Sequence, residues 1–289
     1  MRSGPSIAVV VAWLSLIGAQ PVTNSFLASA IDRDGNAVLD LSADEFVIEE
    51  GGARCEAVDV RPASYPIAIA VDTSSFARDS FISLRHALHV FVDALSARQV
   101  ALYSFGGPPS RVVEFTTDLS RLDQAIDRFF ASPTSGARPY DTVKMAATDL
   151  KTLHAPLTMI VLLSAGGPDN SSVGPRDMQN AVRQARAMVN VIDLRPVRAS
   201  SGLSHQGRPT PVVSEDLYLS ALAQETRGSY DRISQEGGYL ASLERLRRLI
   251  ESEVVVEYTP PSKAATSQEL RVGVRLPGVT IRAVGLDPK

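Results

Sequence analysis

The feature that most constrains the fold is a short apolar run that ends in an acid and hydroxyl side chains. Residues 66–76 read PIAIAVDTSSF, so an uninterrupted apolar stretch leads directly into Asp72, Ser74 and Ser75. A run without polar alternation is typical of a strand buried on both faces in the middle of a parallel sheet. Ligands of open α/β sheets bind at the carboxyl ends of such strands. The sequence therefore predicts that Asp72 and Ser74 face a crevice at that end of the sheet.

The overall composition is that of a folded protein and disfavours a nucleic-acid partner. The chain has 289 residues, 44% of them hydrophobic and 21% charged. This length gives room for one large domain, or for one domain with an appendage. The formal net charge is −3, which argues against a nucleic-acid ligand held by bulk electrostatics.

Residues 1–19 have the pattern of a secretion signal. Arg2 is positive, residues 7–17 are apolar, and a small-residue cleavage site follows at Ala19. The apolar run is shorter than the ~20 residues of a membrane-spanning helix. An uncleaved anchor or a buried strand is the alternative interpretation. We expect an exported protein, periplasmic or extracellular, with no stable membrane insertion after the signal is removed.

Predicted strands and helices alternate over residues 64–253. This order predicts an α/β fold: a doubly wound, mostly parallel, six-stranded sheet with helices on both faces. The short connection at 105–109 predicts one antiparallel edge strand. The expected strands are 66–72, 99–105, 111–116, 157–164, 189–195 and 229–233, and the expected helices are 79–96, 119–131, 139–153, 174–188, 214–226 and 240–252.

Two β segments flank this α/β domain, at residues 20–63 and 254–289. Each is too small to be stable alone, so we expect the two to pair in one small β unit. The expected strands of the first segment are 22–31, 37–41, 46–52 and 55–60, and those of the second are 253–258, 269–275 and 279–284, with the last two forming a hairpin. The single cysteine, Cys55, fits a small buried side chain, although a bond to another chain stays open.

No motif of catalysis or tight metal binding is present in the sequence. It contains no Gly-x-Ser-x-Gly elbow, no lysine-containing phosphate loop and no Gly-x-Gly-x-x-Gly. His86 and His89 share a helix face but have no third ligand for zinc. A catalytic triad of Ser74, His205 and an acid has no supporting pattern. We therefore expect no catalytic residues and no cofactor.

With this order of elements, the chain resembles the exported bacterial proteins, frequent in acidobacteria, that carry a von Willebrand factor type A (VWFA)-related domain. The resemblance covers nearly all of the chain after the signal. It implies a doubly wound α/β domain with a metal-ion-dependent adhesion site at the top of the sheet. The segments that carry it are DRDGNAVLDLSADEFVIEEGG, PIAIAVDTSS, QVALYSFGGPPSRVVEFTTD, SGARPYDTVKMA, LTMIVLLSAGGPD, LYLSALAQETRGSY and EVVVEYTPPS.

The ligand set of that adhesion site is incomplete in this sequence. Asp72 and Ser74 match the family's Asp-x-Ser-x-Ser pattern, but Phe76 replaces its second serine. Alignment to the family puts Ala137 where a threonine ligand belongs and Ala165 where an aspartate ligand belongs. Since Mg²⁺ demands an octahedral shell of oxygens, we expect no bound metal, with Asp72 and Ser74 as vestigial ligands.

Two acids on neighbouring loops are the candidates for substitute ligands. Asp141 lies on the second loop, where it also fits the first turn of a helix. Asp169 lies on the third loop, where it also fits a turn. A Mg²⁺-dependent binder with a rearranged site is therefore one alternative.

We expect a non-catalytic interaction module that binds a protein ligand of unknown identity through the loops at 73–79, 134–140 and 165–174. The alternatives are a structural component of an envelope assembly, built by strand pairing between chains, and an enzyme that acts through Asp72 and Ser74. The sequence does not specify an oligomeric state. The expected contact residues are Thr73, Ser75, Phe76, Arg138, Pro139, Gly166, Gly167 and Pro168.

Overall fold

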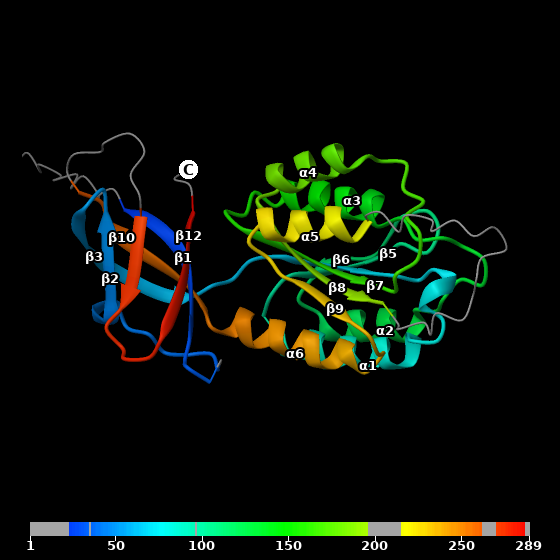
Figure 1. Cartoon of the computed structure of the whole chain (residues 1–289), viewed down its shortest axis with the longest axis horizontal. Coiled ribbons are helices and arrows are strands. Elements are labelled where there is room, and N and C mark those ends of the chain that lie inside the picture. The colour runs from blue at the N-terminus through cyan, green and yellow to red at the C-terminus, as the bar shows by residue number, and fades with distance from the viewer. Residues whose placement is uncertain (1–22, 35, 96, 196–214, 262–269, 287–289) are drawn as a thin grey trace, which may run out of the picture.

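A computed structural model describes residues 23–34, 36–95, 97–195, 215–261 and 270–286. The expected secretion signal, residues 1–19, lies outside the described residues. So does the segment at 197–213, which is rich in Ser, Gly, Pro and Arg and is expected from the sequence to be an exposed inserted loop. Two six-stranded sheets organise the rest, one antiparallel and one flanked by helices (Figure 1).

The helix-flanked sheet has the strand order β6-β5-β4-β7-β8-β9. Its neighbours pair in parallel, except that β6 is an antiparallel edge strand, so the sheet is mixed. β4 lies in the middle, and all of its residues are 0% exposed, as its apolar run predicts. The strands are β4 (Ile67–Val71), β5 (Val100–Ser104), β6 (Ser110–Thr116), β7 (Thr158–Ser164), β8 (Ala187–Leu194) and β9 (Tyr230–Ile233).

Helices cover both faces of this sheet. Alternate residues of β4 point to opposite faces, so Ile67 and Ile69 pack in one core while Ala68 and Ala70 pack in another. The first core is covered by α1 (Phe81–Ala94), α2 (Leu119–Arg128) and α6 (Gly238–Glu251). The second is covered by α3 (Pro139–Thr152), α4 (Pro175–Gln184) and α5 (Glu215–Glu225) (Figure 1). No helix among the described residues is both long and apolar enough to cross a membrane.

The two flanking segments form one antiparallel sheet, with the order β11-β2-β3-β10-β1-β12. Its core is built around Phe26 (0% exposed) and Ile48 (1% exposed). Phe46 meets the Phe26 ring edge-on, with ring centroids 6.2 Å apart. The half-buried Cys55 packs against this core from β3. The strands are β1 (Asn24–Ile31), β2 (Phe46–Glu50), β3 (Ala53–Pro62), β10 (Glu253–Thr259), β11 (Leu270–Val274) and β12 (Thr280–Leu286).

Two predictions for this β unit are wrong. Residues 37–41 form no strand: Ala37 makes a single bridge to Ile31, and Asp40 has a left-handed φ of 62°. Nor do β11 and β12 pair with each other as a hairpin, because β11 pairs with β2 and β12 with β1. Both strands pack on the same core, through Val272 and Ile281. The sheet therefore curls around that core, and its last two strands lie at opposite edges.

A buried charged cluster lies where the β unit joins the α/β part. Glu253, only 5% exposed, accepts a hydrogen bond from the Tyr65 hydroxyl. The Arg98 guanidinium lies 5.3 Å from the centroid of the Tyr65 ring. Burial raises the pKa of Glu253 to about 7, although the Tyr65 hydroxyl and the charges of Arg98 and Arg282 oppose the rise.

Candidate functional site

Asp72 connects two of the three loops at the carboxyl edge of the helix-flanked sheet. The first loop is 73–79, the second is 134–140 and the third is 165–174. Asp72 follows β4 directly and is 0% exposed. Its Oδ1 accepts a hydrogen bond from the Ser74 amide at 2.8 Å, and its Oδ2 accepts one from the Ala165 amide at 2.9 Å. Both carboxylate oxygens therefore bind backbone amides, one in the first loop and one in the third.

The hydroxyl groups of Ser74 and Thr73 also accept hydrogen bonds from backbone amides. Ser74, 0% exposed, precedes the short 3₁₀ helix η2 (Ser75–Ala77), and its hydroxyl accepts from the Phe76 amide at 3.4 Å. This is the ordinary role of an N-cap serine. The Thr73 hydroxyl accepts from the Gly106 amide at 2.9 Å, which joins the first loop to the end of β5.

A second buried acid, Asp193, lies near Asp72. It is on β8 and is 0% exposed. Its Oδ2 accepts from Arg195 Nε at 2.8 Å and from the Tyr230 hydroxyl at 2.7 Å, while its Oδ1 has no hydrogen-bond partner among the described residues. Burial raises the pKa of Asp72, and the charge of Asp193 adds to that rise, whereas hydrogen bonds from Ser74 and Ala165 oppose it.

Asp193 is not among the residues expected at this edge, although the sequence carries a signal for it. Like Asp72, it follows an apolar strand segment, and the carboxyl ends of parallel strands meet at one edge of a sheet.

Backbone contacts hold the second loop in place. Ala137, only 3% exposed, forms single β-bridges with Gly106 and Asp169. The Arg138 amide donates to the carbonyl of Phe105 at 3.0 Å. A Cβ on Gly106 would lie 2.1 Å from the Thr73 carbonyl, so only glycine allows this approach of the two loops.

The two candidate substitute ligands both organise the third loop. Asp141, 9% exposed, accepts from the amide and hydroxyl of Ser172 at 3.1 Å each, and from the Val173 amide at 2.7 Å. Asp169 accepts from the Ser171 amide at 2.8 Å. Within the described ranges, no three His, Cys, Asp or Glu side chains are grouped in a way that would hold a metal ion.

The residues at this edge do not fit the oxygen shell of Mg²⁺. Both oxygens of Asp72 already bind amides, and Ala137 and Ala165 carry no side-chain oxygen. Phe76 likewise carries no side-chain oxygen, so these positions do not supply the octahedral oxygen shell that Mg²⁺ requires.

The exposed part of the site is smaller than the sequence predicts. Phe76 is 41% exposed and lies against Gly167, where a Cβ would be 2.4 Å from the Phe76 ring. Pro168 is exposed beside it. Three of the expected contact residues, Thr73, Pro139 and Gly167, are buried.

The remaining expected contacts, Ser75, Arg138 and Gly166, are partly buried. Gly166 has a φ of 74°, and its carbonyl accepts from Arg195 Nη1 at 3.0 Å. The Arg195 side chain therefore joins Asp193 on β8 to the third loop, since it also donates to Asp193.

Comparison with known proteins identifies the fold but no close relative. No family model and no curated protein matches this sequence. Among solved structures, a von Willebrand factor type A protein from Catenulispora acidiphila is 11% identical with a TM-score of 0.53, and the match covers 93% of this chain and 74% of that one. This chain has a von Willebrand factor type A-like fold.

A second match is the proximal thread matrix protein 1 of the mussel byssus. It is 13% identical with a TM-score of 0.50, over 74% of this chain and 49% of that one.

In the von Willebrand factor type A-like α/β part of our protein, the first, second and third loops meet at the carboxyl edge, around Asp72.

Proposed function

We propose that this protein is a non-catalytic interaction module that binds a protein ligand through the carboxyl-edge loops and needs no metal ion to do so. The observation that carries this proposal is the bonding of Asp72. Its carboxylate accepts amides from the first and third loops, at 2.8 and 2.9 Å. The hydrogen bonds supply the cross-link between loops that a bound cation would otherwise supply.

The binding surface is centred on Phe76. Phe76 is 41% exposed and its ring packs against Gly167, a contact that reduces the side-chain entropy lost on binding. Arg138 and Pro168 lie on the neighbouring loops. An aromatic ring and an arginine on a rigid base are the residue types that dominate binding energy at protein interfaces.

A catalytic role is disfavoured by the geometry of Ser74. A nucleophilic serine needs a base within hydrogen-bond reach. The Ser74 hydroxyl is fully buried and accepts the Phe76 amide, and no described histidine contacts it. The crevice therefore lacks the serine–histidine pair of a hydrolase among the residues that the structure describes.

We place the protein among exported VWFA-related proteins of the acidobacterial type, with a metal-ion-dependent adhesion site that has lost its ligands. The signal pattern of residues 1–19 supports export, to the periplasm or beyond the cell. The replacement of ligand side chains by Phe76, Ala137 and Ala165 supports the loss of the cation.

The test is a capture experiment with a matched control. Immobilised protein is exposed to envelope proteins of the source cell in chelator, and the bound proteins are identified and titrated. F76S should abolish capture, whereas V58S, which removes another exposed apolar side chain (58% exposed) on β3, should leave capture unchanged. Capture that requires Mg²⁺, or that survives F76S, contradicts the proposal.

An envelope assembly built by strand pairing is a second candidate. β11 and β12 are the two edges of the antiparallel sheet, and an unpaired edge is a template for another strand. Concentration-dependent oligomers that a proline in β12 abolishes would favour this function. A rearranged Mg²⁺ site has less support, since Asp141 and Asp169 already accept backbone amides of the third loop, from Val173 and Ser171.

A further inference from the structure

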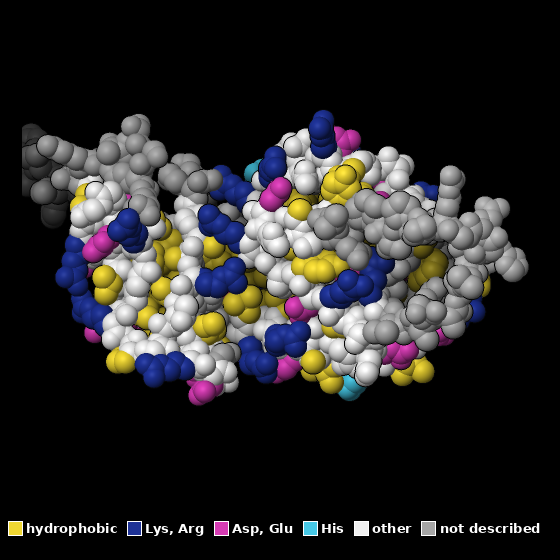
Figure 2. Space-filling view, viewed as in Figure 1, with side chains coloured by type: hydrophobic (Ala, Val, Ile, Leu, Met, Phe, Trp, Pro, Cys, Tyr) yellow, Lys and Arg dark blue, Asp and Glu magenta, His cyan; other side chains and the backbone are white. Residues whose placement is uncertain are grey.

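A basic groove lies at the opposite edge of the α/β sheet, beside the β unit. The helices α3, α4 and α5 end there, because each leads into the amino end of a parallel strand. One hollow of about 340 Å³ is lined by Leu157, Met188 and Val284, together with arginines. A second, of about 810 Å³, adjoins it and shares Pro156 and Arg186. Figure 2 shows dark blue side chains along the hollow between the two sheets.

The backbone at these helix ends is unusual. His154, Arg186 and Arg227 follow α3, α4 and α5, each in the left-handed conformation, with φ of 51°, 52° and 62°. Glycine is the common residue at this position after a helix. The Arg227 amide donates to Gln224 and the Gly228 amide to Ala223, which is the full Schellman pattern.

The left-handed conformation of His154, Arg186 and Arg227 favours a ligand-binding role for these side chains over a purely structural one. A left-handed conformation costs a non-glycine residue about 1–2 kcal/mol. Three of the five described non-glycine residues with positive φ carry a basic side chain into this one groove. A cation stabilises a helix end through the dipole, but Lys151 and Arg183 already occupy the last turns of α3 and α4. The last turn of α5 has no basic residue, so the dipole accounts less well for His154 and Arg186 than for Arg227.

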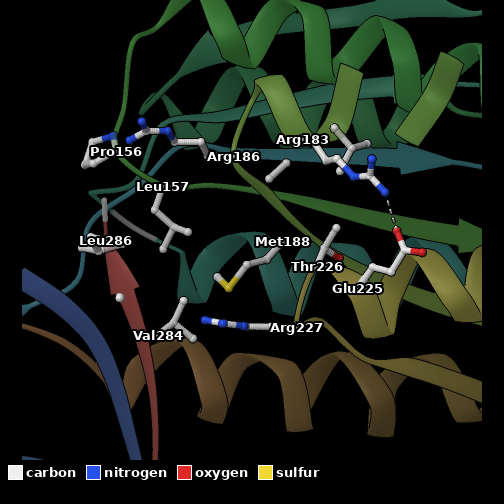
Figure 3. A pocket seen from close by; sticks show the side chains of 13 residues that line it. Pro156, Leu157, Arg183, Arg186, Met188, Glu225, Thr226, Arg227, Val284 and Leu286 are labelled. Atoms are coloured by element: carbon white, nitrogen blue, oxygen red, sulfur yellow. Dashed lines mark hydrogen bonds and ion pairs between the residues drawn. The ribbon is translucent and has the colours of Figure 1, made fainter. Parts of the chain in front are cut away.

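Two of the three arginines that line the smaller hollow have no acidic partner within the described part of the chain. Arg183 pairs with Glu225 at 3.3 Å, whereas Arg186 and Arg227 have no acidic side chain within ion-pair distance among the described residues. Figure 3 shows Arg186 and Arg227 on opposite sides of the apolar side chains of Leu157, Met188 and Val284. The groove thus combines an apolar floor with two available guanidinium groups.

We propose that this groove binds an extended acidic segment of a partner polypeptide, with Arg186 and Arg227 pairing with its carboxylates. Guanidinium groups bind carboxylates in bidentate geometry, and the apolar floor accepts the alternate side chains of an extended chain.

The form of the groove favours a polypeptide segment over a small anion. The two adjoining hollows extend the groove from the end of α3 to Val284 and Leu286 on β12. β12 is an edge strand that pairs with β1 alone among the described strands. Such an edge offers backbone donors and acceptors to an extended chain.

The experiment measures fluorescence anisotropy of a labelled peptide of alternating glutamate and leucine, titrated with the full chain. R186Q/R227Q should weaken binding at least about tenfold, which is ~1.4 kcal/mol. The matched control R176Q/R232Q removes the same charge from exposed positions on α4 and β9 outside the groove, and should stay within about twofold of wild type.

A second double variant tests whether a loss of peptide binding reflects the lost side chains or a loss of folding. R186G/R227G places glycine at both left-handed positions, so it should melt no lower than wild type and still lose the peptide. F76S should bind the peptide as wild type does, which keeps this groove distinct from the loops of the proposed function.

Three results would overturn the proposal. They are wild-type affinity in R186Q/R227Q, equal binding of a peptide of alternating lysine and leucine, and binding of inorganic phosphate as tight as that of the acidic peptide. The last result would assign the groove to a small anion.

Discussion

Replacing Asp72 by alanine should destabilise the protein strongly, because its carboxylate is the hydrogen-bond partner of two backbone amides. The Ser74 and Ala165 amides donate to it at 2.8 and 2.9 Å, and Asp72 is 0% exposed. A donor left unpaired in a buried site costs about 1–3 kcal/mol. Relief of the buried charge offsets part of that cost, so we expect a net loss of about 2–4 kcal/mol in the free energy of unfolding.

The assay is denaturant unfolding followed by circular dichroism, supported by thermal melts. A loss of that size lowers the Tm by about 5–15 °C in a protein of this length. D72N keeps one acceptor oxygen and should lose about half as much free energy. The matched control is D79A, which removes an exposed acid shortly after η2 and should stay within about 0.5 kcal/mol of wild type. D72A as stable as D79A would refute the reasoning.

Two further predictions test other parts of the fold. Since burial raises the pKa of Glu253 from 4.5 to about 7, the folded state binds the extra proton within this window, and stability falls by up to about 3 kcal/mol as the pH rises through it. The difference in unfolding free energy between wild type and E253Q should change with pH over this window. The difference between wild type and the exposed control E236Q should not depend on pH. An E253Q difference that does not depend on pH would refute the raised pKa of Glu253. G106A should lower stability by about 1–3 kcal/mol, because its Cβ would lie 2.1 Å from the Thr73 carbonyl. G285A, on the exposed edge strand β12, where a Cβ meets nothing within 4 Å, is the control in the same melts, and equal Tm values would contradict the close approach.

The α/β part could be predicted from the sequence because its signals are local and agree with one another. The apolar run of β4 is buried on both faces, so it shows no alternation, and Asp72 then marks the strand end. The antiparallel edge strand β6 follows from its short connection to β5. Neither conclusion needs knowledge of distant contacts.

The pairing within the β unit could not be predicted, because it depends on contacts between distant segments. A turn at 275–279 favours a hairpin, and Gly278 does take a positive φ of 79°. Yet β12 pairs with β1 and β11 with β2, since a curled sheet lets both strands cover one core. Local turn signals do not report that curvature.

The candidate site, too, could be predicted where its signals are local but not where it depends on contacts between distant segments. The sequence pattern places Asp72 at the end of β4, where the structure has it, but it does not report which loop residues are exposed. Gly167 is buried because the Phe76 ring lies on it, and Pro139 is buried at the start of α3. These positions depend on how three separate loops pack, which no single segment encodes.

The most direct test of the central claim is a thermal melt of the wild-type protein with Mg²⁺, with Mn²⁺ and with chelator. A cation that binds only the folded state adds about 2.7 kcal/mol at a hundredfold excess over its Kd. We predict the same Tm in all three conditions, because hydrogen bonds to Asp72 hold the loops without a cation. A rise of several degrees with Mg²⁺ or Mn²⁺ that D72A abolishes would contradict this account and establish a metal-dependent adhesion site.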